Sequence, residues 1–313
     1  MNERRLVIFL MGACLFLLLL SACSKSSPVP SSTPTVLVTK ITPADSPEPT
    51  QTPIPPTSTP LPLAIVVNGE GITLAEYQAE VARFQASSTI SGTNIATDTE
   101  TIVLNELIDQ TVLAQAAAEN GYIVDDTLLQ ARIDALVNQL GGAQALEAWL
   151  ANHGYHEQDF RIALKRSIGA AWMRDQIIAA VPDTADEVHV MQILVPTKQE
   201  ADQVYASLQS GKDFTEVAST YDPLTKGDLG WFPRGYLSDL IIEETAFGLQ
   251  AGQYSGVIQT EVGFHILYLV EKDPEHPLLP DAKRAVQVKA LQDWIDERRG
   301  QSEIQILLPS QKP

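Results

Sequence analysis

Apolar positions between residues 74 and 182 recur at the spacing of α-helices. The clearest stripe is Leu104, Leu107, Ile108 and Val112, which follows the i, i+3, i+4, i+8 pattern of one buried helix face. We therefore expect a helix over residues 100–120. Similar stretches predict helices over 126–140, 143–152 and 157–179, and Pro182 ends this helical block.

Local signals set the limits of the first elements. Residues 64–70 read as a short strand that enters a Gly-containing turn. Thr73 and Glu76 form a capping-box pattern ahead of a helix over 74–85, and the polar stretch at 87–98 is predicted to be a loop. Asp125 or Asp126 is expected to cap the helix that runs to Leu140.

From residue 187 the pattern changes to the period of two that is typical of strands. Over 188–195 the residues fall on two alternating faces, with Val188, Val190, Gln192 and Leu194 on one and His189, Met191, Ile193 and Val195 on the other. A second strand over 263–270 places His265 on the same face as Leu267 and Leu269. Between the strands we expect helices over 198–210, 213–220 and 239–248, with a Pro/Gly loop at 222–235. A hinge at 273–280 then leads to a helix over 281–300 and a strand over 304–308. The whole pattern predicts an α+β fold.

Composition narrows the classes of protein that this chain can be. Its 313 residues hold 21 Lys and Arg against 39 Asp and Glu, for a formal net charge of −18. So acidic a chain is repelled by phosphate backbones, and we expect no nucleic acid partner. The two cysteines, Cys14 and Cys23, can build neither a disulfide framework nor a cysteine-based metal site.

The N-terminus has the pattern of a bacterial lipoprotein signal. Arg4 and Arg5 precede an apolar run over residues 6–20, and Leu-Ser-Ala-Cys at 20–23 resembles a lipobox. We expect a signal peptide over 1–22, a lipid on Cys23, and a location on the extracytoplasmic face of the cell membrane. The alternative is an ordinary secretory signal or a short membrane anchor, for which the apolar run is short.

Residues 23–62 form an expected linker between the lipid and the folded part. Of the 39 residues from 24 to 62, 7 are Ser, 8 are Thr and 11 are Pro. Such a segment buries too little apolar surface to offset its ordering entropy. An extended polyproline conformation would hold the folded part up to roughly 100 Å from the bilayer.

The block from residue 187 to 272 resembles a parvulin-type peptidyl-prolyl isomerase domain. The resemblance rests on strings that occur in order: VMQILV at 190–195, DFTEVA at 213–218, GDLGWF at 227–232, AFGL at 246–249 and GFHIL at 263–267. It implies that His265 is one catalytic histidine and that Gln192 stands where the family has the other. Asp222 is implied to match an acidic or cysteine position of the family.

The same resemblance implies an apolar cup for the proline ring of a substrate. Its five members are Leu229, Phe232, Leu237, Ile242 and Phe247. The alternative is that these side chains are core residues of a small α+β domain. Rotation about a peptide bond has a barrier of ~18–20 kcal/mol, and an apolar cup would lower it by removing water from the amide. This reaction needs no nucleophile, so we expect neither a cofactor nor a metal.

The helical block resembles the N-terminal chaperone domain of foldases of the SurA and PrsA kind. The matching strings are VVNGEGIT at 66–73 and LNELIDQ at 104–110. The resemblance implies a mostly helical chaperone domain built from 63–184 plus 275–313, with the parvulin domain inserted at 185–274. Its implied partners are exported polypeptides, unfolded or folding, that contain X–Pro bonds. Three functions stay open: a prolyl isomerase foldase, a holdase chaperone whose parvulin domain is degenerate because of Gln192, and an assembly factor devoted to one membrane partner.

Overall fold

The computed structural model describes residues 61–91 and 98–308. The expected signal peptide at 1–22, Cys23, and all but the last two residues of the 23–62 linker lie outside them. Within the described ranges, no helix combines the length and the apolar character needed to cross a membrane.

A small antiparallel sheet joins the two ends of the described chain. It holds β1 (Leu63–Val67), β2 (Glu70–Thr73) and β7 (Ile304–Ile306) in the order β2-β1-β7. Asn68 and Gly69 connect the first two strands with φ values of 50° and 83°. Two left-handed residues make the tight hairpin turn that Asn-Gly favours. The turn was expected, whereas β2 was missed because only four residues form it.

Five helices follow β2, and four of them agree closely with the helical pattern. They are α2 (Leu74–Ser91), α3 (Thr99–Glu119), α4 (Asp126–Leu140), α5 (Ala143–Asn152) and α6 (Glu157–Ala179). The exception is α2, which continues to Ser91 into the stretch predicted to be a loop. There the hydroxyls of Ser87 and Ser88 donate hydrogen bonds to carbonyl oxygens one turn back, so the helix itself satisfies them.

Caps fix the starts of two of these helices. The Thr73 hydroxyl accepts a hydrogen bond from the Glu76 amide at 3.1 Å, as the capping-box pattern predicts. The Glu76 carboxylate does not complete the box but accepts a hydrogen bond from Arg166 of α6 at 2.6 Å. Asp125 is the residue that caps α4, through the Leu128 amide at 2.8 Å.

The C-terminal segment packs on the helical part from a distant point in the sequence. Leu291 and Ile295 of α10 (Pro280–Gln301) are buried with Leu113 of α3 and Ala170 of α6. After α10, β7 pairs with β1. These are the contacts that a domain built from 63–184 plus 275–313 requires, and its boundaries remain a prediction.

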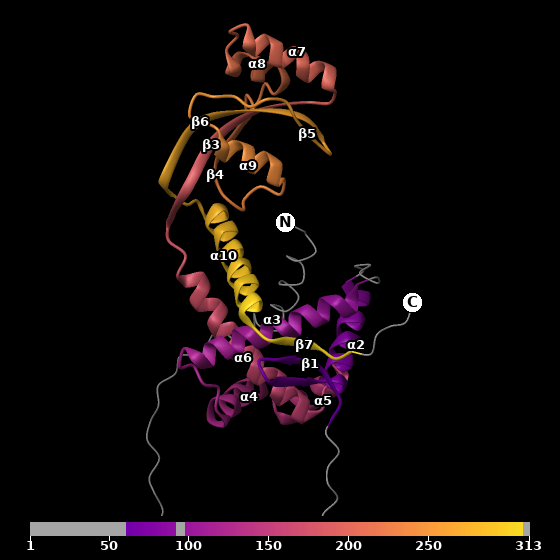
Figure 1. Ribbon diagram of the computed structural model, residues 1–313. Coiled ribbons are helices and arrows are strands. Elements are labelled where there is room, and N and C mark those ends of the chain that lie inside the picture. Colours follow the sequence, from indigo (N-terminus) through magenta and orange to yellow (C-terminus); the bar gives the residue numbers. More distant parts are fainter. Residues whose placement is uncertain (1–60, 92–97, 309–313) are drawn as a thin grey trace, which may run out of the picture. The chain divides into compact units, whose positions relative to one another are not determined.

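A second antiparallel sheet organises residues 184–277 (Figure 1). Its strands are β3 (Thr184–Val195), β4 (Asp228–Pro233), β5 (Ile258–Thr260) and β6 (Gly263–Pro277), in the order β4-β3-β6-β5. The predicted loop at 222–235 therefore contains a strand, and part of the predicted hinge belongs to β6. Strand β4 holds Gly230 and ends in Pro233, which an edge strand tolerates.

Helices cover both faces of this second sheet (Figure 1). On one face lies α9 (Leu240–Gly248), and on the other lie α7 (Lys198–Gln209) and α8 (Phe214–Tyr221). Val188 and Val190 of β3 pack under α9, while Ile193 and Val195 pack under α7 and α8. The alternation expected for 188–195 is thus confirmed with both faces buried, and so is the α+β class.

Candidate active site

The pairing of β3 with β6 brings together two of the predicted site residues. In this register Gln192 lies opposite Leu267 and Leu194 lies opposite His265. Gln192 and His265 are therefore diagonal neighbours on the face that α9 covers further along the strands. His265 Nδ1 lies 3.1 Å from Gln192 Oε1, and the His265 side chain is buried.

Thr260 of β5 holds the other ring nitrogen of His265. Its hydroxyl lies 2.8 Å from Nε2 and also accepts a hydrogen bond from the Val262 amide at 3.2 Å. Because Oε1 of Gln192 can only accept, Nδ1 carries the proton and Nε2 accepts from Thr260. Two hydrogen bonds therefore fix both the tautomer and the orientation of the imidazole.

Burial keeps the imidazole of His265 neutral. Desolvation lowers the pKa of His265 from its ordinary value, and the negative charge of Asp239 partly opposes this effect. Asp239 itself caps α9 by accepting from the amides of Ile241 and Ile242 at 3.0 and 3.3 Å. A neutral histidine is the form that the hydrogen bond from Thr260 to Nε2 requires.

Asp222 is placed in the loop that precedes β4. Its carboxylate accepts hydrogen bonds from the amides of Leu224 and Thr225, both at 3.1 Å, from the Thr225 hydroxyl, and from the Gly227 amide at 3.3 Å. These bonds, above all the one from the Thr225 hydroxyl, hold the pKa of the Asp222 carboxyl below its ordinary value. Among the described residues, no hydrogen bond joins Asp222 to His265 or to the side chain of Gln192.

Gly227 links this loop to the main chain at Gln192. The Gln192 amide donates to the Gly227 carbonyl at 2.7 Å. A Cβ atom at residue 227 would lie 2.0 Å from the Gln192 carbonyl oxygen, and its φ of 76° also favours glycine. Asp222 therefore holds the loop whose Gly227 carbonyl accepts from the main chain of β3 at Gln192.

All five predicted cup residues belong to one apolar cluster under α9. Phe232, Ile242 and Phe247 are buried, whereas Leu229 and Leu237 are partly exposed at the edge of the cluster. The guanidinium carbon of Arg234 lies 4.2 Å from the centre of the Phe247 ring. The first three residues thus pack as the floor of the cluster, and the two leucines are the members that solvent reaches.

Thr260 is the contact residue that sequence reasoning missed. Thr260 pairs with Gly263 across the turn between β5 and β6, and Gly263 lies two residues before His265. The only signal in the sequence is the spacing of Thr260, Gly263 and His265, because a hairpin turn brings the first beside the last.

Within 61–91 and 98–308, no group of three or more His, Cys, Asp or Glu side chains could hold a metal ion.

Two family models match the chain. Residues 182–271 match the PPIC-type PPIASE domain, and residues 53–174 match the SurA-like N-terminal domain. These matches confirm both resemblances found in the sequence, and in the same order along the chain.

Curated relatives carry the names that these two domains suggest. A "Foldase protein PrsA" of Geobacillus sp. (strain WCH70) is 29% identical over 131 residues, which cover 40% of this chain and 47% of that protein. A "Chaperone SurA" of Alkalilimnicola ehrlichii is 28% identical over 207 residues, 54% of this chain and 47% of that protein. The chain thus spans about half the length of these two relatives.

One solved structure resembles the chain over most of its length. The crystal structure of "Peptidylprolyl Isomerase (PrsA)" from Bacillus cereus is 20% identical, covers 74% of this chain and 84% of its own, and gives a TM-score of 0.41.

Proposed function

We propose that this chain, which carries a SurA-like N-terminal domain and a PPIC-type PPIase domain, is a membrane-anchored extracytoplasmic foldase. It catalyses cis/trans isomerisation of X–Pro bonds in exported polypeptides and chaperones them while they fold. X–Pro bonds populate both isomers and interconvert in tens to hundreds of seconds without a catalyst. Folding chains therefore gain from an isomerase.

The observation that carries this proposal is the array of Gln192, His265 and Thr260 on the sheet face that bears the apolar cluster. A proline ring placed against Leu229 and Leu237 would bring its preceding amide bond to this array. Removal of water from the amide disfavours the charge-separated resonance form that keeps the bond planar. The twisted state is then reached at a lower cost, with no covalent step.

The array would hold the substrate in place without titrating at neutral pH. The Nδ1–H of His265 and the Thr260 hydroxyl are already engaged. The side-chain amide group of Gln192 donates no hydrogen bond to any described residue, so its N–H groups can bind the substrate's carbonyl. Gln192 would thus orient the bond that rotates, and His265 would orient Gln192.

One observation favours the second candidate, a holdase that binds chains without turning them over. Phe232, Ile242 and Phe247 are each at most 5% exposed, which leaves only two leucines of the cup for the proline ring. A shallow apolar site of this kind would bind extended chains while lowering the rotation barrier little.

A protease-coupled assay on proline tetrapeptides separates the two candidates. The foldase accelerates isomerisation above the rate in buffer, and Phe247→Ala lowers this rate because the floor of the cluster is lost. Suppression of client aggregation is measured in parallel. If the protein suppresses aggregation but does not accelerate isomerisation even at high concentration, the result contradicts the foldase proposal and supports the holdase.

Anchoring at the membrane is proposed from the lipobox alone. Replacement of the expected lipid attachment site, Cys23→Ser, should leave an unprocessed precursor without thioether-linked lipid. Labelling with a radioactive fatty acid gives the readout. Normal maturation and labelling of the Cys23→Ser protein would remove the anchor from the proposal.

A further inference from the structure

A carboxylate is buried in the first turn of α9, beside the apolar cluster. Glu243 is 4% exposed and directly follows Ile242, which belongs to the floor of the cluster. Burial of a carboxylate costs free energy unless hydrogen bonds replace the water that it loses. Glu243 is no part of the array of Gln192, His265 and Thr260, and nothing in the proposed reaction uses it.

Both oxygens of Glu243 accept from the main chain of one short loop. Oε1 accepts from the Gly235 amide at 2.8 Å, and Oε2 accepts from the Leu237 amide at 3.1 Å. The amide between them, that of Tyr236, donates to the Pro233 carbonyl at 3.3 Å. Three successive amides in the connection from β4 to α9 are therefore engaged, which fixes the conformation of this connection.

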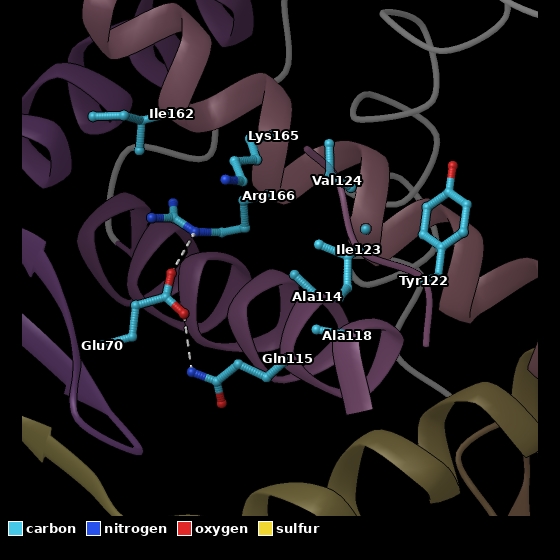
Figure 2. A pocket seen from close by; sticks show the side chains of 11 residues that line it. Glu70, Ala114, Gln115, Ala118, Tyr122, Ile123, Val124, Ile162, Lys165 and Arg166 are labelled. Carbon is cyan, nitrogen blue, oxygen red and sulfur yellow. Dashed lines mark hydrogen bonds and ion pairs between the residues drawn. The ribbon is translucent and has the colours of Figure 1, made fainter. Parts of the chain in front are cut away.

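Glu70 shows how a carboxylate is held when its partners are side chains. At the pocket between α3 and α6 (Figure 2), the Glu70 side chain is 46% exposed and accepts from the Gln115 side chain at 3.0 Å. It also lies 3.9 Å from Nε of Arg166. Among the described residues Glu243 forms no such ion pair, and its partners are the two loop amides. We conclude that it stabilises the loop rather than a contact between side chains.

The loop that Glu243 holds carries an accessible part of the cup. Leu237 is one of the two cup leucines that solvent reaches, and its own amide is bonded to Glu243. Gly235 has a φ of 86°, which a glycine adopts at little cost. If the loop were free, a proline ring would have to order Leu237 when it binds, and this ordering would consume part of the binding free energy. A loop that is fixed in advance avoids that loss.

We infer that Glu243 is a positioning residue of the isomerase site. Its carboxylate fixes loop 234–238 before a substrate arrives and holds Leu237 where the proline ring binds. The inference rests on the proposed function, because it takes the cup to receive X–Pro segments. Glu243 acts through Leu237 and not on the bond that rotates. It therefore determines how tightly a proline peptide binds more than how fast the bound peptide isomerises.

Glu243→Gln tests this in the full-length protein. One amide oxygen replaces two carboxylate oxygens, so one of the two loop amides loses its acceptor. Fluorescence anisotropy with a labelled Ala-Ala-Pro-Phe peptide should show binding that is weaker by about three- to tenfold. Exchange NMR at saturating peptide should show an isomerisation rate changed by less than about twofold.

The neighbouring residue provides a matched control. Glu244→Gln makes the same change one residue further along α9, where the side chain is 71% exposed and lies 3.5 Å from Arg234. It should leave both the affinity and the rate unchanged. A peptide with Ala in place of Pro should bind equally to the wild type and to Glu243→Gln, because it presents no ring to Leu237.

A double-mutant cycle separates positioning from a general structural role. Leu237→Ala removes the contact with the proline ring, and the addition of Glu243→Gln should then weaken binding no further. A residue that only stabilises the domain would weaken binding by the same factor in both backgrounds.

Hydrogen exchange on the wild type gives a reading that does not depend on a variant. The Leu237 amide should exchange slowly, and equally so with and without the peptide, as expected of a loop fixed in advance. Thermal melting shows whether each variant is folded. If Glu243→Gln does not fold, the exchange measurement decides.

Four results would overturn the inference. They are wild-type affinity in Glu243→Gln, an equal loss in Glu244→Gln, a further loss in the double mutant, and rapid exchange of the Leu237 amide in the free wild type. Failure of the proposed function is seen separately, as wild-type protein that binds the proline peptide but does not accelerate its isomerisation. In that case the binding data still decide the role of Glu243.

Discussion

His265 Nδ1 lies 3.1 Å from Oε1 of Gln192 across the β3–β6 pair. The parvulin resemblance places a second histidine where this glutamine stands. A glutamine preserves the hydrogen bond to the imidazole but cannot exchange a proton. This site therefore holds a hydrogen bond between the two positions and has one titrating group fewer than the resemblance implies.

Restoring the second imidazole should raise the isomerase rate. Gln192→His puts an aromatic ring with one donor and one acceptor beside His265, and we expect kcat/KM to rise several-fold, the equivalent of about 1 kcal/mol. The control is the same substitution in the other sheet, Gln305→His in β7, which should leave the rate unchanged. A lower rate in Gln192→His would mean that an imidazole at this position cannot replace the contact that the Gln192 amide makes with the substrate.

Activity should fall in acid as His265 becomes protonated. Burial lowers the pKa of His265 below its ordinary 6.5, so the imidazole is neutral at neutral pH. It takes up a proton as the pH falls through this lowered pKa. Protonation puts a hydrogen on Nε2, which then cannot accept from Thr260. Measurement of kcat/KM against pH and NMR titration of the His265 ring should give the same midpoint, below 6.5. A midpoint above 6.5 would contradict the assignment of a neutral buried imidazole.

Asp109 should make the folded protein more stable in mild acid. Burial raises the pKa of Asp109 to about 6 despite the opposing charge of Arg299, which donates to its carboxylate at 2.9 Å. With an ordinary pKa of 3.8 in the unfolded chain, this contribution is complete below that pH and is lost as the pH rises through 6.

The neutral variant tests this sign. Between pH 4 and pH 7 the wild type should lose on the order of 2 kcal/mol of unfolding free energy through Asp109. Asp109→Asn should not show this loss. Urea unfolding at both values measures it, with the exposed Asp134→Asn on α4 as the control. An unchanged pH dependence in Asp109→Asn would show that its carboxylate is not the source.

The C-terminal segment should be needed for the helical part to fold stably. Leu291 and Ile295 of α10 are buried against α3 and α6, and β7 pairs with β1. Truncation after Pro274 should therefore lower the melting temperature strongly, whereas deletion of 187–272 with the ends joined should leave a cooperatively folding helical domain. Circular dichroism melting of both proteins checks this. Equal melting of the truncated and full-length chains would refute a domain in two parts.

The sequence predicted the elements whose signals are local. The stripe from Leu104 to Val112 and the Asp125 cap determine their helices through neighbours a turn away, and α3 and α4 form as expected. Strand β4 was missed because its stability comes from pairing with β3, about 40 residues earlier. Long-range pairing is not visible in the local pattern of Asp228–Pro233, which holds a glycine and a proline.

The sequence predicted which residues lie at the candidate site better than it predicted what each of them contacts. The family strings located His265, Gln192 and the apolar cluster, but the burial of Phe232 and Phe247 depends on how α9 packs. The contact of Thr260 with His265 arises from the β5–β6 turn, which no expected element included.

Exchange NMR on a single proline peptide tests the central claim most directly. The cis and trans forms of the X–Pro bond give separate resonances that exchange in tens to hundreds of seconds without a catalyst. With a small molar fraction of the protein, we predict exchange cross-peaks between the two forms, and a clear loss of their intensity with His265→Ala. Resonances that shift on binding but show no exchange cross-peaks, at any concentration of the wild-type protein, would contradict catalysis at this site.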